Sequence, residues 1–143
     1  ACDLRLISDR ARFGEIFVKR GLMPDGGGTW MLPRLIGLGR ALEMMLTGDL
    51  VDAAEAHRIG LANRVFPAAQ LESAAWDFAR TLAAGPPLVH RAVEAAVEAA
   101  SHGSLDQALE GEVRGQLKLL ASADFQEGVA AFLEKRPPAF QGE

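Results

Sequence analysis

One carboxylate in this sequence stands where a turn of the backbone could aim it at a ligand. Asp25 lies between Pro24 and the three consecutive glycines at 26–28, and a helical pattern begins just after them. Consecutive glycines are unfavourable inside helices and strands, so they indicate a sharp turn or a close approach of the backbone. Such a loop could present Asp25 as a general base. An aspartate before glycines also commonly caps a turn or a helix, and residue chemistry alone leaves both interpretations open.

The elements that must position this loop follow from the sequence pattern on either side of it. From Leu4 the residues alternate between apolar and polar, as in a half-buried strand, and a second short strand is predicted over 11–13. A turn and a half of helix is predicted over 15–20. After the loop, Thr29 can cap a new helix, and Pro33 would then fall near its first turn.

The next stretch of the chain predicts two further helices and a strand. Residues 40–46 have a helical pattern that ends at Gly48. Asp52 and Glu55 form a pattern like a capping box for a short helix, and a strand over 61–66 is closed by Pro67.

The second half of the chain has an almost purely helical pattern. Apolar residues recur at helical spacing in four stretches between 71 and 133, and Ser104 with Gln107 forms a capping box for the third. Alanines widen the apolar faces of these helices, so each could bury more than one face. They could form a packed bundle, a subunit interface, or both.

Composition limits the possible partners and compartment. The chain has 143 residues with a net charge of −4, which argues against nucleic acid as a partner. It contains no run of about 18 apolar residues, so no membrane span is expected. The single cysteine, Cys2, cannot form an internal disulfide, and no signal peptide is visible, so we expect a cytoplasmic protein. The three histidines (57, 90 and 102) lack metal-ligand spacing, and no metal site is predicted. A strand at the very start, without an initiator methionine, suggests the later part of a longer protein.

Several motifs occur together, in one order and at one spacing. They are Ala1-Cys2-Asp3, Arg12-Phe13-Gly14, Gly21-Leu22-Met23-Pro24, Gly27-Gly28-Thr29 and Leu32-Pro33-Arg34-Leu35-Ile36-Gly37. This pattern resembles the crotonase (enoyl-CoA hydratase/isomerase) superfamily over essentially the whole chain. The resemblance implies an α/β fold, the C-terminal half of a crotonase (ClpP-like) ββα spiral. Residues 1–66 would end the spiral core and carry the Asp25 loop, and residues 67–143 would form a helical trimerisation region.

The resemblance also implies a reaction on acyl-coenzyme A thioesters. In this superfamily, two backbone N–H groups form an oxyanion hole that stabilises an enolate. Both donors, and often a catalytic glutamate, lie upstream of the residues matched here. We therefore expect the missing N-terminal half of the same enzyme as a partner, and a homotrimer or a dimer of trimers. Coenzyme A would arrive as part of the substrate, and no separate cofactor is expected.

Two positions bear on which reaction is catalysed. Related hydratases have a second glutamate eight residues before the position of Asp25, where this chain has Phe17. Glu15 lies two residues earlier and, on a strand or a helix, would not stand where Phe17 stands. This chain is similar to three groups of relatives in having aspartate at the position of Asp25. They are dienoyl-CoA isomerases, 2-(1,2-epoxy-1,2-dihydrophenyl)acetyl-CoA isomerases of phenylacetate breakdown and chlorobenzoyl-CoA dehalogenase. The resemblance favours isomerisation, with Asp25 as the proton shuttle. The alternatives are a hydratase that uses an upstream glutamate and a non-catalytic, oligomerising fragment.

The resemblance assigns further contacts to the substrate. Phe17, Pro24, Gly26 and Trp30 would bind its acyl part, although Phe17 and Trp30 could equally be core residues. In the helical half, Phe132 and Lys135 would contact the adenine and phosphate end of coenzyme A. Lys135 could instead be a solvated cation at a helix C-terminus, where the helix dipole favours positive charge.

Overall fold

The computed structural model describes residues 2–143, so Ala1, the first residue of the Ala-Cys-Asp motif, lies outside the described residues. The chain forms two compact units, one ending at Asp77 and the other spanning Phe78–Glu143. The boundary between these two units falls inside helix α4 (Leu71–Ala83).

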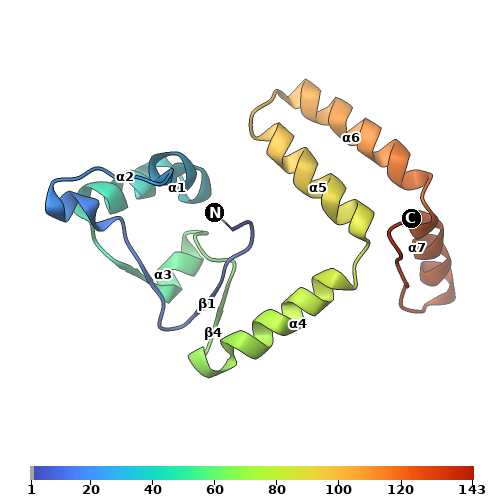
Figure 1. The fold of residues 1–143 in the computed structure, drawn as a ribbon, viewed down its shortest axis with the longest axis horizontal. Coiled ribbons are helices and arrows are strands. Elements are labelled where there is room, and N and C mark those ends of the chain that lie inside the picture. Colours follow the sequence, from blue (N-terminus) through green and yellow to red (C-terminus); the bar gives the residue numbers. More distant parts are fainter. Residues whose placement is uncertain (1) are drawn as a thin grey trace. The chain divides into compact units, whose positions relative to one another are not determined.

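The first unit contains two pairs of short strands. Strand β1 (Leu6–Ser8) runs parallel to β4 (Arg64–Phe66), with Leu6 opposite Arg64 (Figure 1). Strand β2 (Arg12–Phe13) runs antiparallel to β3 (Val51–Asp52), with Phe13 opposite Val51. The strand predicted at the start of the chain therefore pairs with a segment that is distant in the sequence.

The helical segments of the first unit begin and end at recognisable signals. They are η1 (Ile16–Arg20), α1 (Gly28–Ile36), α2 (Leu38–Thr47), α3 (Ala53–Arg58) and η2 (Ala68–Gln70). The predicted end of α2 at Gly48 is confirmed, since this glycine has a φ of 65° and its N–H donates to the carbonyl of Met44. The predicted cap of α3 is also confirmed: the carboxylate of Asp52 accepts the N–H of Glu55 at 2.8 Å.

The expected cap of α1 is wrong. Gly27, with a φ of 84°, occupies the N-cap position, and Thr29 lies inside the helix. Backbone groups close the turn without a side chain, because the carbonyl of Gly27 accepts the N–H groups of Trp30 and Met31 at 3.0 and 2.9 Å. The helix therefore starts earlier than expected, and Pro33 falls in its interior rather than in its first turn.

A small apolar core joins these elements. Its buried members are Ile7, Leu32, Ile36, Ala41, Met44, Met45, Ala53, Ala56, Ile59, Leu61 and Ala62. Ala41 on α2 and Ala56 on α3 have no exposed surface, and such small side chains let the backbones around them pack closely. This core supports the strands and helices on either side of the loop that carries Asp25.

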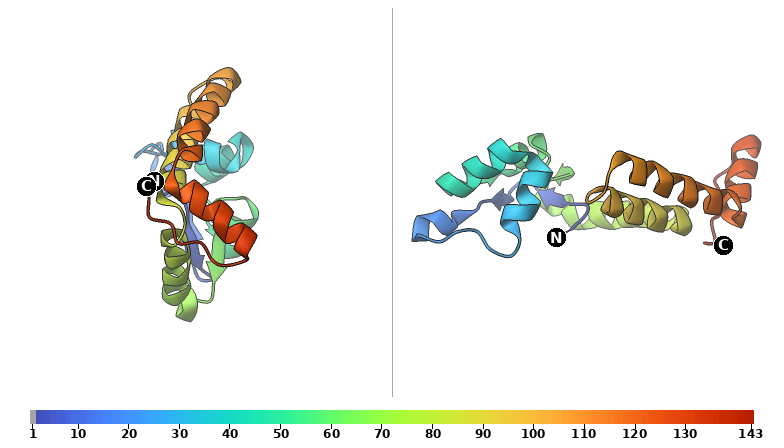
Figure 2. Two further views of the ribbon diagram at one scale, coloured as in Figure 1. Left: turned by 90° about the vertical axis from the view of Figure 1, so that its right-hand side faces the viewer. Right: turned by 90° about the horizontal axis from the view of Figure 1, so that it is seen from above.

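The second unit is helical. Helices α5 (Pro87–Ala100) and α6 (Leu105–Leu120) form a hairpin, and they lie side by side in every view (Figures 1 and 2); α7 (Ala123–Glu134) follows. The predicted capping box is confirmed, because Ser104 and Gln107 exchange both of its hydrogen bonds. No helix among residues 2–143 has the length and apolar character needed to cross a membrane.

The apolar faces predicted for these helices are largely uncovered. Among residues 2–143, the one buried apolar residue of the second unit is Ala131. The exposed large apolar residues of its helices include Val93, Val97, Leu105, Leu109, Val113, Leu117, Leu120, Phe132 and Leu133.

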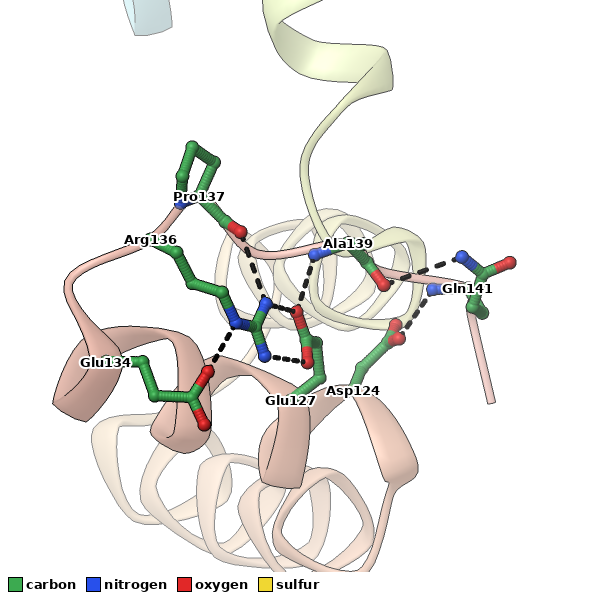
Figure 3. A network of polar contacts seen from close by, with 7 residues as sticks. All are labelled: Asp124, Glu127, Glu134, Arg136, Pro137, Ala139 and Gln141. Atoms are coloured by element: carbon green, nitrogen blue, oxygen red, sulfur yellow. Dashed lines mark hydrogen bonds and ion pairs between the residues drawn. The ribbon is translucent and has the colours of Figure 1, made fainter.

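Polar contacts hold the C-terminal segment (residues 135–143) against α7 (Figure 3). The guanidinium of Arg136 donates to both carboxylate oxygens of Glu127, and it also donates to Glu134 at 2.6 Å. The N–H of Ala139 donates to Glu127 at 2.8 Å. The hydrogen bonds from Arg136, and then the one from Ala139, hold the pKa of Glu127 at about 2.

The carboxylate of Glu127 makes the stability of the C-terminal segment depend on pH in the acid range. A lowered pKa in the folded state stabilises the fold above the ordinary glutamate value of 4.5, and this contribution is lost as the pH falls toward about 2. Urea unfolding at a series of pH values should show wild type more stable than Glu127→Gln near pH 5. The difference should narrow steadily between pH 4.5 and 2. If the difference in stability between wild type and Glu127→Gln did not change with pH, this would contradict the lowered pKa of Glu127 in the folded protein.

Candidate active site

The loop that carries Asp25 connects η1 to α1 and has a backbone that requires glycine. Gly26 and Gly27 have φ values of 58° and 84°, a region that L-residues with side chains rarely adopt. The carbonyl of Asp25 accepts the N–H of Gly28 at 2.9 Å, which closes the turn at the start of α1. The side chain of Asp25 is exposed, and α1 has no side-chain cap. In this structure Asp25 therefore does not act as the cap of α1.

The other residues predicted to bind the acyl part lie on three consecutive elements of the first unit. Phe17 is half-buried on η1, Pro24 and Gly26 flank Asp25 in the loop, and Trp30 lies in the first turn of α1. Trp30 is 53% exposed, so neither aromatic residue belongs to the buried core. Their role as pocket residues stays a prediction.

Trp30 is held by an arginine one turn further along α1. The guanidinium carbon of Arg34 lies 3.2 Å from the centroid of the Trp30 ring, and its Nη1 donates to the carbonyl of Trp30 at 3.0 Å. A cation over the face of an indole is attractive and keeps the ring in one orientation. The first turn of α1 thus has an aromatic side chain that is stacked against a cation of the same helix.

Glu15 is a second acid near this loop, and the sequence pattern does not reveal it. It occupies the N-cap position of η1, and its Oε1 lies 3.2 Å from the point where a Cβ on Gly28 would be. Burial, and then the negative charge of Asp25, raise the pKa of Glu15. The third glycine of the loop was the available signal, because a glycine can mark the close approach of another group.

The two residues predicted to contact coenzyme A lie in the second unit, at the end of α7. Phe132 is 81% exposed, and the N–H of Lys135 donates to its carbonyl at 3.3 Å. Lys135 ends the helix with a φ of 55°, in the left-handed region. The role of both residues in binding coenzyme A stays a prediction.

The second unit also contains an apolar cavity of about 460 Å³ between parts of α5, α6, α7 and the C-terminal segment. Phe132, Leu133 and Phe140 are among the residues that line it, and none of its lining residues comes from the Asp25 loop. Within residues 2–143, no three His, Cys, Asp or Glu side chains are grouped so that they could hold a metal ion.

Comparison with known proteins now places this fold and loop in a family. All of residues 1–143 match the family model described as enoyl-CoA hydratase/isomerase. The chain belongs to the enoyl-CoA hydratase/isomerase family. The match confirms the crotonase resemblance of the sequence.

Its relatives include proteins named as hydratases and a protein named as an isomerase. The chain is 44% identical over 142 residues to a probable enoyl-CoA hydratase of Rhodobacter capsulatus, covering 99% of this chain and 55% of that protein. It is 38% identical over 141 residues to 1,2-epoxyphenylacetyl-CoA isomerase of Escherichia coli, covering 99% of this chain and 54% of that protein. The chain thus spans about half the length of these relatives.

A solved structure confirms the predicted fold class. The crystal structure of enoyl-CoA hydratase from Bacillus anthracis superposes with a TM-score of 0.94 at 35% identity, covering 99% of this chain and 55% of that one. The architecture is that of the C-terminal half of the crotonase fold, with few strands and a helical second part.

Proposed function

We propose that this chain supplies Asp25 to an enzyme that isomerises acyl-coenzyme A thioesters by proton transfer. The observation that carries the proposal is the exposed Asp25 carboxylate on a glycine turn, within a chain of the enoyl-CoA hydratase/isomerase family. Exposed apolar side chains lie on both sides of Asp25 in the sequence, namely Leu22, Met23 and Trp30. They suit an acyl group brought next to the carboxylate.

In the proposed reaction, Asp25 removes a proton from a carbon of the acyl chain, and the electron pair moves onto the thioester as an enolate. Backbone N–H groups of the N-terminal half stabilise the oxygen of this enolate. Asp25 then returns the proton to a different carbon, so the substrate is isomerised without net gain or loss of atoms. Coenzyme A enters as part of the substrate, and no further cofactor is needed.

The second unit is proposed to provide assembly and coenzyme A contacts. The uncovered apolar residues of α5 and α6 support a homotrimer or a dimer of trimers, because large exposed apolar patches mark interaction sites. Lys135 and the exposed ring of Phe132 lie together at the end of α7, and they suit the phosphate and adenine groups of coenzyme A.

Hydration is the second candidate, supported by the names of relatives such as the Rhodobacter capsulatus protein. Phe17 argues against it, because a phenyl ring does not activate water and makes the site drier. Replacing Phe17 with glutamate in the complete enzyme should introduce measurable water addition to an enoyl-CoA and lower isomerisation. Product analysis by mass spectrometry separates the two reactions, since hydration adds 18 Da.

The matched control is Phe17→Leu, which keeps the position apolar and should add no hydration. Wild type that already hydrates as fast as it isomerises would favour the hydratase alternative. Turnover by the 143-residue chain alone would contradict the non-catalytic alternative.

A further inference from the structure

We propose that the hairpin of α5 and α6 binds a second copy of this chain head to tail, so that the acidic first half of α6 in one copy lies in a basic groove of the next copy. This contact would build the proposed homotrimer, so it rests on that part of the proposed function. The two surfaces that meet, and the charges that pair them, all lie within the second unit.

The first surface is a groove of about 450 Å³ between α5 and α6, which we call the basic groove. Small side chains line much of it, among them Ala92, Ala96 and Gly115, and they leave room for the side chains of another helix. Three exposed cations also line it, namely Arg91, Arg114 and Lys118. Of these, Arg114 also pairs with Glu110 of its own helix at 3.6 Å. The groove therefore suits a partner helix that is apolar on one face and acidic beside it.

The second surface is the first half of α6, from Leu105 to Val113, which we call the acidic segment. Leu105, Leu109 and Val113 recur every four residues, so they share one face of the helix, and all three are exposed. Asp106 and Glu112 are exposed acidic residues of the same segment. The acidic segment therefore combines the apolar face and the negative charge that the basic groove suits.

The charges of the hairpin are separated along its length. From residue 87 to residue 120, the sequence contains three Lys or Arg, at 91, 114 and 118, and five Asp or Glu, which all lie between residues 94 and 112. Because α5 and α6 run in opposite directions and are joined through residues 101–104, the cations gather at the open end and the acids toward the joined end (Figure 1). Two hairpins that meet open end to joined end bring opposite charges together, whereas like ends repel each other.

The two surfaces lie on opposite sides of α6, and this determines the symmetry of the contact. Gly111 and Gly115 line the basic groove. Leu109 and Val113 each precede one of these glycines by two residues, which corresponds to about 200° around an α-helix. One copy can therefore offer its acidic segment to a second copy while its own groove takes the segment of a third. Such a heterologous contact closes into a ring when the rotation between copies allows it, as in a trimer.

Charge reversal in the complete enzyme tests this pairing, with sedimentation velocity as the measurement. Arg91→Glu combined with Lys118→Glu should weaken self-association about 100-fold or more, since the groove would then repel the acidic segment. Asp106→Lys combined with Glu112→Lys should weaken it similarly. The variant with all four reversals should assemble as wild type does, because the two surfaces again have opposite charges. A variant that is merely misfolded would not be rescued in this way.

The control is Arg10→Glu combined with Arg20→Glu, which makes the same change in net charge on exposed residues of the first unit and should leave assembly unchanged. A wild-type enzyme that sediments as a monomer, or a groove variant that assembles like wild type, would overturn the proposal. Failure of the four reversals to restore assembly would also overturn it, and the groove would then be covered by another surface, such as that of the N-terminal half. Isomerisation is measured on the same samples: assembled wild type without turnover overturns the proposed reaction and not this contact.

Discussion

Replacing Asp25 with asparagine should lower the kcat of isomerisation by the complete enzyme about 10²- to 10⁴-fold, the usual contribution of a positioned general base. The amide has the size of the carboxylate but cannot accept the proton of the substrate. The loop should keep its shape, because the backbone carbonyl of Asp25, and not its side chain, closes the turn onto Gly28. Affinity for the acyl-coenzyme A should therefore change little, so kcat should fall while Kd stays close to that of wild type.

Asp49→Asn is a suitable control for this experiment. Asp49 is an exposed aspartate of the same unit whose carboxylate pairs with Lys19 at 3.5 Å, and its replacement should leave kcat within about twofold of wild type. Equal turnover in wild type and Asp25→Asn would show that Asp25 only shapes the loop. Loss of binding along with turnover would show that the asparagine disturbs the site.

Replacing Asp124 with alanine should lower the free energy of unfolding of the second unit by about 2–4 kcal/mol. The side chain of Asp124 is 6% exposed. Its two oxygens accept the N–H groups of Gln141 and Gly142 at 2.7 and 2.9 Å, as Figure 3 shows for Gln141. Alanine removes both charge-assisted hydrogen bonds and leaves two N–H groups without their acceptor. The C-terminal segment should then detach from α7.

Hydrogen exchange of the Gln141 and Gly142 amides, together with urea unfolding followed by helix circular dichroism, would measure this effect. Asp106→Ala is the matched control, because Asp106 is an exposed aspartate in the first turn of α6 and should contribute only about 0.5 kcal/mol. Equal losses in the two variants would show that the contacts of Asp124 with the C-terminal segment are not stabilising.

Local chemistry made much of the fold predictable. The capping residues Asp52 and Ser104 and the end of α2 at Gly48 are signals within one turn of the element that they define, and the structure confirms all three. The Asp25 loop was predictable for the same reason. Turns that need positive φ select glycine regardless of the rest of the fold.

What the sequence did not reveal depends on contacts between distant residues. The partner of β1 is β4, which follows it after three intervening α-helices and the short helix η1. The contact of Glu15 with Gly28 exists only after η1 and the loop have folded back, so no spacing in the sequence indicates it. Thr29 seemed a good cap because its hydroxyl suits that role, but the backbone of Gly27 had already closed the turn.

The left-handed backbone of Lys135 has a cost in stability at the end of α7. Glycine adopts this conformation readily, whereas a residue with a side chain costs roughly 1 kcal/mol or more there. A sequence selected for stability alone would therefore place glycine at this position. A lysine at this position therefore leaves stability unrealised at the end of α7, while it places a positive charge where the helix dipole favours one.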